Sequence, residues 1–270
     1  MKDVKLSQKL TESALMLALA TILSLVKIIE LPFGGSITLA SMLPMVILSY
    51  RYGFLWGLFS GFVYSLIQLL FGLNNLSYAT SVIAAIAIIM LDYLLAFSCT
   101  AVGGLFRKMK SQTSAIALGA FVTCIVRFLC HTISGCTVWA GVSVPTADAF
   151  LYSLIYNSAY MIPETIITVV VAVYLSAALV FSKKTIIPQR KKDAPEHLTV
   201  LSVISGLISL AGVIVAAVFL FPAMQNENGF DITGIVNANP FGVVIPLVIA
   251  VIGIVVMIIL RSVKSKTKKA

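Results

Sequence analysis

The chain has 270 residues, of which 60% are hydrophobic and only 11% are charged, and its mean hydropathy is +1.05. Soluble domains carry about 25% charged residues, so the composition excludes a soluble protein and indicates an integral membrane protein. The formal net charge of +9 would suit nucleic acid, but the basic residues lie in short clusters between apolar segments. We therefore attribute the net charge to loops that orient the chain in a membrane, and we predict no nucleic-acid partner.

Eight segments are apolar enough, or nearly so, to cross a lipid bilayer, which takes about 20 residues as a helix. In chain order we expect them near residues 11–30, 37–50, 54–72, 80–105, 114–135, 149–182, 198–222 and 241–261. The second segment is short, so we expect it to be tilted or partly shielded by neighbouring helices. The predicted fold class is an all-α integral membrane protein.

The segments fall into two units. Residues 1–182 hold six closely spaced segments, 183–197 form a basic linker, and 198–270 hold a helical hairpin with a basic tail. We expect a six-helix core with an additional carboxy-terminal hairpin, eight helices in all. The hairpin is almost purely aliphatic, so packing or assembly is its simplest role. We find no convincing internal repeat, unlike in many secondary carriers.

The basic clusters indicate the orientation of the chain. If it crosses the membrane eight times, nearly all Lys and Arg residues fall on one side, whereas the opposite loops carry Asp148, Glu227 and Asp231. The positive-inside rule places the basic side in the cytoplasm. We expect a multi-pass cell-membrane protein with both termini in the cytoplasm and the linker 183–197 on the same side.

Motifs of nucleotide hydrolysis and catalysis are missing from the sequence. It contains no GxxxxGK[ST] loop, no nucleophilic Ser elbow and no HExxH helix. The four cysteines lack the paired spacing of a metal site or a disulfide framework. We predict that they are small packing residues: Cys99, Cys124, Cys130 and Cys136. We predict no enzyme, no cofactor and no metal, so any ATP that drives transport would be used by a separate subunit.

The candidate site is a group of polar and aromatic residues in the fifth and sixth segments. Arg127 and His131 are four residues apart and share one helical face, as do Tyr152 and Tyr156, with Asn157 adjacent. Polar groups at membrane depth are costly and mark functional sites. With the orientation above, these residues converge on the external half of the membrane, where a substrate would be captured.

Asp92 and Tyr93 form a second polar signal, within the apolar run AIAIIMLDYLLAF. A carboxylate in such a run must be neutralised, paired or turned toward a ligand. Arg127 is the expected partner of Asp92. A structural pair that fixes two helices together and a pair that lines a ligand pocket are both compatible with the sequence, and both can hold together.

Two further features, the aromatic residues near the end of the fifth segment and Glu164, allow two interpretations each. Trp139 and the nearby tyrosines suit an interfacial aromatic belt, but their closeness to His131 favours contact with a cationic ligand. Glu164 follows Pro163 and is equally compatible with a pocket-lining and a structural role. Lys27 and Glu30 suit side chains that reach toward the membrane surface.

The chain resembles the thiamine-specific S components, the substrate-capture subunits, of energy-coupling factor transporters. The motifs occur in the same order over residues 10–182. They are Ala14 and Ala18 in ALMLA, LPMVILSYRYG at 43–53, LDYLLAF at 91–97, GGLFR at 103–107, Arg-x-x-x-His at 127–131, Gly135, Trp139, and YSLIYN at 152–157 with Pro163 and Glu164. The chain departs from the family at Gly34 and Gly35, where some members have a tryptophan, and in its additional hairpin.

This resemblance implies a non-catalytic six-helix protein that captures thiamine from outside the cell. It implies docking on a transmembrane coupling subunit with two ATP-binding-cassette ATPases, through Ala14 and Ala18. Together with the pattern above, it predicts that thiamine contacts Asp92, Tyr93, Arg127, His131, Trp139, Tyr152, Tyr156 and Asn157. An S component for another vitamin or heterocyclic precursor, an ion-coupled carrier and an intramembrane enzyme are the alternatives.

Overall fold

The computed structural model describes residues 4–31, 34–79, 81–139, 147–182, 184–188, 196–226 and 229–266. This described part is predominantly helical, and its strands form short two-stranded hairpins. Six helical stretches are long and apolar enough to cross a membrane: Phe54–Phe71, Val82–Lys108, Gln112–Cys136, Ala149–Ala178, Val200–Ala223 and Pro240–Leu260. The chain is an all-α multi-pass membrane protein, as the composition predicts.

Helix α1 (Leu6–Leu25) ends five residues earlier than the predicted segment 11–30. The chain then forms a hairpin of β1 (Lys27–Glu30) and β2 (Ser36–Thr38), in which Lys27 lies opposite Thr38. The prediction of helix to residue 30 was wrong because Ile28 and Ile29 favour strand and Pro32 cannot continue a helix.

Helix α2 (Leu43–Tyr52) is surrounded by other helices. Its residues from Leu43 to Ser49 are all buried, and its ten residues span only about 15 Å. The shielding expected for the second segment is therefore confirmed. Arg51, at the end of α2, pairs with Glu12 of α1 and donates a hydrogen bond from Nε to the carbonyl of Ser182 at 2.8 Å.

Helix α3 (Phe54–Phe71) leads into a 3-10 turn, η2 (Leu73–Tyr78). The fourth predicted segment is one coil whose winding changes along its length. It runs through α4 (Val82–Ala87), the π-helical η3 (Ile88–Leu95), α5 (Ala96–Ser98) and the 3-10 helical η4 (Cys99–Lys108). Asp92 and Tyr93 lie in the π-helical part, a distortion that often accompanies functional sites.

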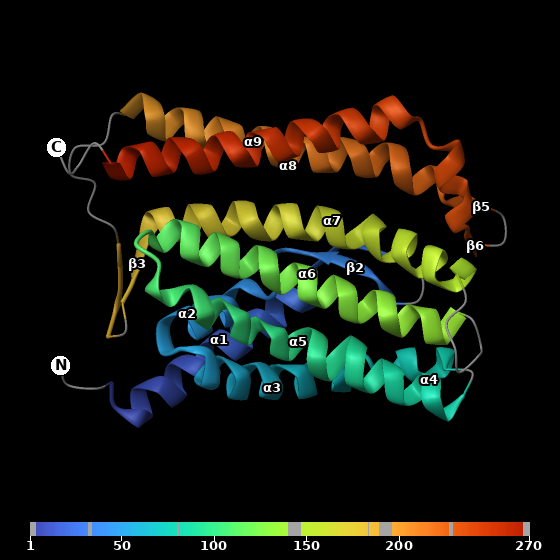
Figure 1. The fold of residues 1–270 in the computed structure, drawn as a ribbon, viewed down its shortest axis with the longest axis horizontal. Coiled ribbons are helices and arrows are strands. Elements are labelled where there is room, and N and C mark those ends of the chain that lie inside the picture. Colours follow the sequence, from blue (N-terminus) through green and yellow to red (C-terminus); the bar gives the residue numbers. More distant parts are fainter. Residues whose placement is uncertain are drawn as a thin grey trace.

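Helices α6 (Gln112–Trp139) and α7 (Ala147–Ala178) pack along each other through the middle of the molecule (Figure 1). A hairpin of β3 (Leu179–Phe181) and β4 (Ile186–Pro188) follows α7. Gln112 joins the start of α6 to this hairpin, because its Oε1 accepts a hydrogen bond from the backbone of Phe181 at 2.9 Å.

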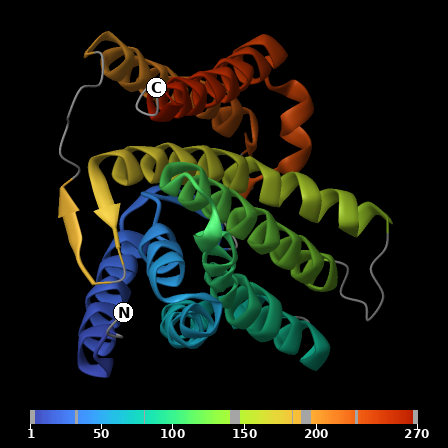
Figure 2. The same ribbon diagram turned by 60° about the vertical axis from the view of Figure 1, so that its left-hand side comes forward.

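The remaining elements form a layer against α7. They are α8 (Glu196–Ala223), the short hairpin of β5 (Gln225–Asn226) and β6 (Gly229–Phe230), η5 (Ile232–Asn237) and α9 (Pro240–Lys266). Figure 2 likewise places α7 between this layer and α6. Small residues allow α8 and α9 to lie close together, since a Cβ on Gly212 would meet the Pro246 carbonyl at 2.5 Å.

Helix α1 begins and α9 ends at the same end of the bundle, whereas the β1–β2 hairpin and α4 lie toward the other end (Figure 1). The contacts of Arg51 belong to the first end. The twenty residues of α1 carry the chain about 30 Å from there to the β1–β2 hairpin. The contacts of Arg51 and the β1–β2 hairpin therefore lie toward opposite ends of the bundle.

Candidate ligand-binding site

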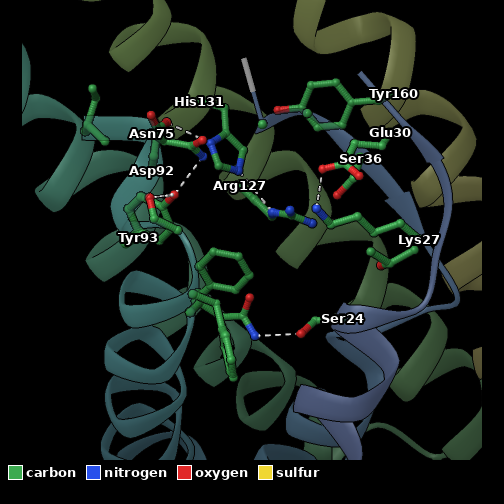
Figure 3. A pocket seen from close by; sticks show the side chains of 18 of the residues that line it. Ser24, Lys27, Glu30, Ser36, Asn75, Asp92, Tyr93, Arg127, His131 and Tyr160 are labelled. Carbon is green, nitrogen blue, oxygen red and sulfur yellow. Dashed lines mark hydrogen bonds and ion pairs between the residues drawn. The ribbon is translucent and has the colours of Figure 1, made fainter. Parts of the chain in front are cut away.

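A cavity of about 340 Å³ lies under the β1–β2 hairpin, within the size range of small-molecule sites. Its walls come from the end of α1, the hairpin, the end of α3 with η2, the π-helical η3, α6 and α7 (Figure 3). Polar and aromatic lining residues are Ser24, Lys27, Glu30, Ser36, Thr38, Ser41, Gln68, Phe71, Asn74, Asn75, Tyr78, Asp92, Tyr93, Phe97, Arg127, His131, Tyr156, Asn157 and Tyr160.

The structure brings six of the eight residues predicted from the sequence to the wall of this cavity: Asp92, Tyr93, Arg127, His131, Tyr156 and Asn157. Tyr152 lies elsewhere, half-buried against a hydrophobic cluster that includes Leu31 and Ile37. It lies about one helical turn before Tyr156, nearer the start of α7, and is not part of the described wall. Trp139 ends α6, but its side chain lies outside the described residues.

A continuous chain of polar contacts crosses the cavity wall. Asp92 Oδ1 lies 2.7 Å from His131 Nδ1, and Arg127 Nε donates to His131 Nε2 at 3.1 Å. Arg127 Nη1 then lies 3.0 Å from Oε2 of Glu164, whose Oε1 accepts a hydrogen bond from Thr38 at 2.7 Å. Figure 3 shows His131 between Asp92 and Arg127.

The expected ion pair between Asp92 and Arg127 is replaced by this longer chain. Among the described residues, the carboxylate within ion-pair distance of Arg127 is that of Glu164, on α7. Asp92 accepts instead from His131 and from the hydroxyl of Ser134, at 2.8 Å. The prediction was wrong because the imidazole of His131, one turn along α6 from Arg127, stands between the two charges.

The contacts of His131 define its protonation. The Nε–H of an arginine can only donate, so Nε2 of His131 is an acceptor and carries no proton. The ring proton is then on Nδ1 and is donated to Asp92. The imidazole is therefore neutral, and the carboxylate of Asp92, whose side chain is 25% exposed, keeps its negative charge in the cavity.

Aromatic rings form the α7 side of the cavity. Tyr156 and Tyr160 meet edge to face with ring centroids 5.7 Å apart, and the ring of His131 lies 6.4 Å from that of Tyr160. The hydroxyl of Tyr160 donates to Oδ1 of Asn157 at 2.6 Å, and Nδ2 of Asn157 donates to the Ser153 carbonyl at 2.8 Å. The amide of Asn157 thus orients Tyr160 from within α7.

Tyr93 holds the opposite wall together. Its hydroxyl donates to the carbonyl of Gly72 at 3.0 Å and accepts from Nδ2 of Asn75 at 2.9 Å. These contacts join the π-helical turn to η2. Its ring is also roughly parallel to that of Phe97, with centroids 6.4 Å apart, and Phe97 in turn lies 5.0 Å from the Arg127 guanidinium.

The sequence places the binding site under the loop before α2, but it does not show how this loop, the β1–β2 hairpin, contacts the walls of the cavity. The backbone N–H of Gly35 donates to the hydroxyl of Tyr156 at 3.0 Å. A Cβ on Gly35 would lie 2.6 Å from that oxygen, and a Cβ on Gly34, whose φ is +89°, would lie 2.3 Å from Asn75. The hairpin is packed against both walls, so a side chain at either glycine would clash with Asn75 or with Tyr156.

Polar groups at the end of α3 were also missed. Gln68 lines the cavity and donates to the hydroxyl of Ser24 at 2.9 Å, and Asn75 contacts Tyr93 as described. Three amide side chains, those of Gln68, Asn74 and Asn75, interrupt or follow an otherwise apolar segment. That local change in polarity is the signal that would have placed them near a ligand.

The fold and the cavity together define a multi-pass membrane protein with a partly polar, aromatic-lined pocket for a small molecule. A family described as thiamine transporter protein matches residues 10–184. The thiamine transporter ThiT of Bacillus subtilis (strain 168) is 30% identical over 183 residues, which cover 63% of this chain and 91% of that protein. The chain belongs to this thiamine transporter family, and the resemblance drawn from its motifs is confirmed.

Proposed function

We propose that the protein is the membrane subunit that captures thiamine for an ATP-driven importer. The observation that carries this proposal is the charge of Asp92. Among the described residues around the cavity, Lys27 lies 2.5 Å from Glu30, and Arg127 is balanced by Glu164. Since the neutral imidazole contributes no charge, the cavity keeps one negative charge, that of Asp92.

A single negative charge among aromatic rings suits a flat monocation. The thiazolium ring of thiamine carries a permanent positive charge, which a carboxylate and nearby ring faces both attract. Its aminopyrimidine ring requires donors and acceptors, which the polar lining of the cavity supplies. Contact of thiamine with Tyr152 and Trp139 stays a prediction from the sequence.

We propose that thiamine enters from outside the cell. The basic linker 183–197 and the basic tail follow elements whose ends lie together, at the opposite end of the bundle from the β1–β2 hairpin. The positive-inside rule places that basic end, and both termini, in the cytoplasm. The cavity then faces the external side.

Coupling to ATP hydrolysis would take place through α1. Ala14 and Ala18 are both exposed on this helix, four residues apart, and so present a surface that another helix can approach closely. We propose that this surface contacts a transmembrane coupling subunit that carries two ATP-binding-cassette ATPases. Replacing both alanines with leucine should abolish uptake in cells that contain the coupling module, while thiamine affinity of the purified protein stays unchanged.

The proposal is tested by titrating the purified protein with thiamine in a calorimeter, alongside a panel of uncharged vitamins. We expect a dissociation constant in the micromolar range or tighter for thiamine and weaker binding of the uncharged compounds. Tighter binding of another vitamin would assign a different cargo. Uptake by vesicles that contain this chain alone would indicate an ion-coupled carrier.

A further inference from the structure

Glu164 is a buried carboxylate in the middle of α7, 1% exposed, that holds two other elements at once. One of its oxygens accepts a hydrogen bond from Thr38 of strand β2, and the other pairs with Arg127 of α6. Glu164 stands behind the wall of the cavity, whereas both of its partners line the cavity. A ligand in the cavity would therefore contact Thr38 or Arg127 and not Glu164 itself.

The more consequential partner is Arg127. Its guanidinium is part of the cavity wall and its side chain is only 9% exposed, so its charge is poorly screened by water. Without a counter-charge it would repel a cationic ligand. Glu164 supplies that counter-charge although it is not one of the residues that line the cavity.

Arg127 also determines the protonation of His131, because its Nε–H occupies the Nε2 atom of the imidazole. A neutral His131 leaves the charge of Asp92 intact. The pairing of Glu164 with Arg127 thus holds the guanidinium in the position that keeps the imidazole neutral. Both effects act in the same direction, toward a cavity that favours a cation.

We propose that Glu164 is a positioning residue that sets the preference of the cavity for cationic over uncharged heterocycles. It does so by neutralising Arg127 from behind the cavity wall and by keeping Asp92 as the unbalanced charge. This inference rests on the proposed function, since it takes thiamine to be the cation that is bound.

The test compares two ligands in the variant Glu164→Gln. Glutamine keeps the size of the side chain and an oxygen that can accept from Thr38, but it leaves the charge of Arg127 unbalanced. Dissociation constants are measured by calorimetry for thiamine and for its uncharged pyrimidine half, 4-amino-5-hydroxymethyl-2-methylpyrimidine. We expect the preference for thiamine, the ratio of the two constants, to fall by about tenfold or more.

Thr38→Val is the matched control. It removes the hydrogen bond to Glu164 with little change in side-chain shape, and every charge stays in place. Both ligands can lose affinity in this variant, but their ratio should stay within about twofold of the unmodified protein. An equal change of the ratio in Thr38→Val and Glu164→Gln would overturn the proposal, because the effect would then come from lost packing.

The double variant Arg127→Gln with Glu164→Gln removes both charges. It is titrated at about pH 8.5, well above the ordinary histidine pKa of about 6.5, so that the imidazole stays neutral without the Arg127 Nε–H and the cavity again keeps one negative charge. The preference for thiamine should return to within about threefold of the unmodified protein, a result that also decides the matter if Glu164→Gln does not fold. A ratio as low as expected for Glu164→Gln alone would overturn the inference. Failure of the unmodified protein to bind thiamine would instead overturn the proposed function.

Discussion

Asp92 and His131 show how a polar group inside the bundle can be satisfied and still keep its charge. Asp92 accepts hydrogen bonds from His131 and Ser134, which meet its need for partners inside the bundle. Neither donor carries a positive charge, so its negative charge remains available to a ligand. An ion pair with Arg127 would have satisfied Asp92 equally well but would have cancelled the attraction for a cation.

Asp92→Asn should therefore weaken thiamine binding by about tenfold or more, about 1.4 kcal/mol, while the uncharged pyrimidine half loses much less. Asparagine preserves the size of the side chain and removes its charge. Ser134→Ala is the control, since it removes one hydrogen bond to Asp92 and leaves the charge. Calorimetric titrations of both variants check this expectation. Equal losses for the two ligands in Asp92→Asn would argue against a charge effect.

At the residue scale, much of the cavity wall could be predicted because polar side chains stand out in apolar runs. Arg127 and His131 share a helical face, so their contact followed from the spacing. The pairing of Arg127 with Glu164 could not be predicted, because it depends on how α7 is rotated and shifted against α6. The expected partner of Asp92 was wrong because the imidazole of His131 lies between Asp92 and Arg127.

At the scale of elements, the β1–β2 hairpin is the part of the cavity that departs most from the segments predicted by hydropathy. Hydropathy does not distinguish a strand from the end of a helix over a few residues, and Lys27–Glu30 is only four residues long. Pro32 with Gly34 and Gly35 marked a turn in the sequence. That the turn would fold back over the ligand cavity depends on its contact with Tyr156, on a distant helix.

Gly35→Ala should loosen this hairpin. The new methyl group would meet the hydroxyl of Tyr156 and the ring of Tyr160 at less than 3 Å, a clash that overpacked sites relieve at a cost of about 1–3 kcal/mol. We expect weaker thiamine binding and faster hydrogen exchange of the Leu31 amide, which donates to the Gly35 carbonyl. Ile28→Ala, at an exposed position of the same hairpin, is the control. Unchanged exchange in Gly35→Ala would contradict the close packing described.

At the scale of the whole molecule, the family match ends at residue 184, before the layer formed by α8 and α9. This layer packs on the outer side of α7, where Val213, Ala250 and Met257 join a cluster with Val169 and Val170. Its described residues contribute nothing to the cavity wall. The layer therefore supports α7 from outside the cavity wall, and it packs against the hydrophobic cluster that contains Tyr156 and Tyr160.

Truncation after Pro188 should keep thiamine affinity within about threefold, because every described lining residue remains. The thermal unfolding midpoint should fall, since Leu220 and Met224 pack in the same cluster as Tyr156 and Tyr160 and their removal exposes that cluster. Calorimetry and a thermal unfolding curve measure the two effects. Loss of thiamine binding with an unchanged unfolding midpoint would show that the layer of α8 and α9 takes part in ligand capture.

The order of the apolar segments was predictable at this scale, because a bilayer demands long apolar runs. Of the eight predicted segments, six are candidate membrane spans in the described part of the chain, and those that form α1 and α2 are not among them. For α2, the sequence predicted tilting or partial shielding by neighbouring helices, but it did not indicate which helices surround it. Its surroundings depend on glycines such as Gly103, where a Cβ would lie 2.7 Å from the Val46 carbonyl. Such close approaches belong to pairs of helices, and single-segment hydropathy carries no information about them.

The most direct measurement is an experimental structure of the protein saturated with thiamine. We predict that thiamine occupies the cavity under the β1–β2 hairpin, with its thiazolium ring next to Asp92 and with Arg127 still paired to Glu164. Thiamine bound at another place, or a cavity that stays empty at saturating thiamine, would contradict the account.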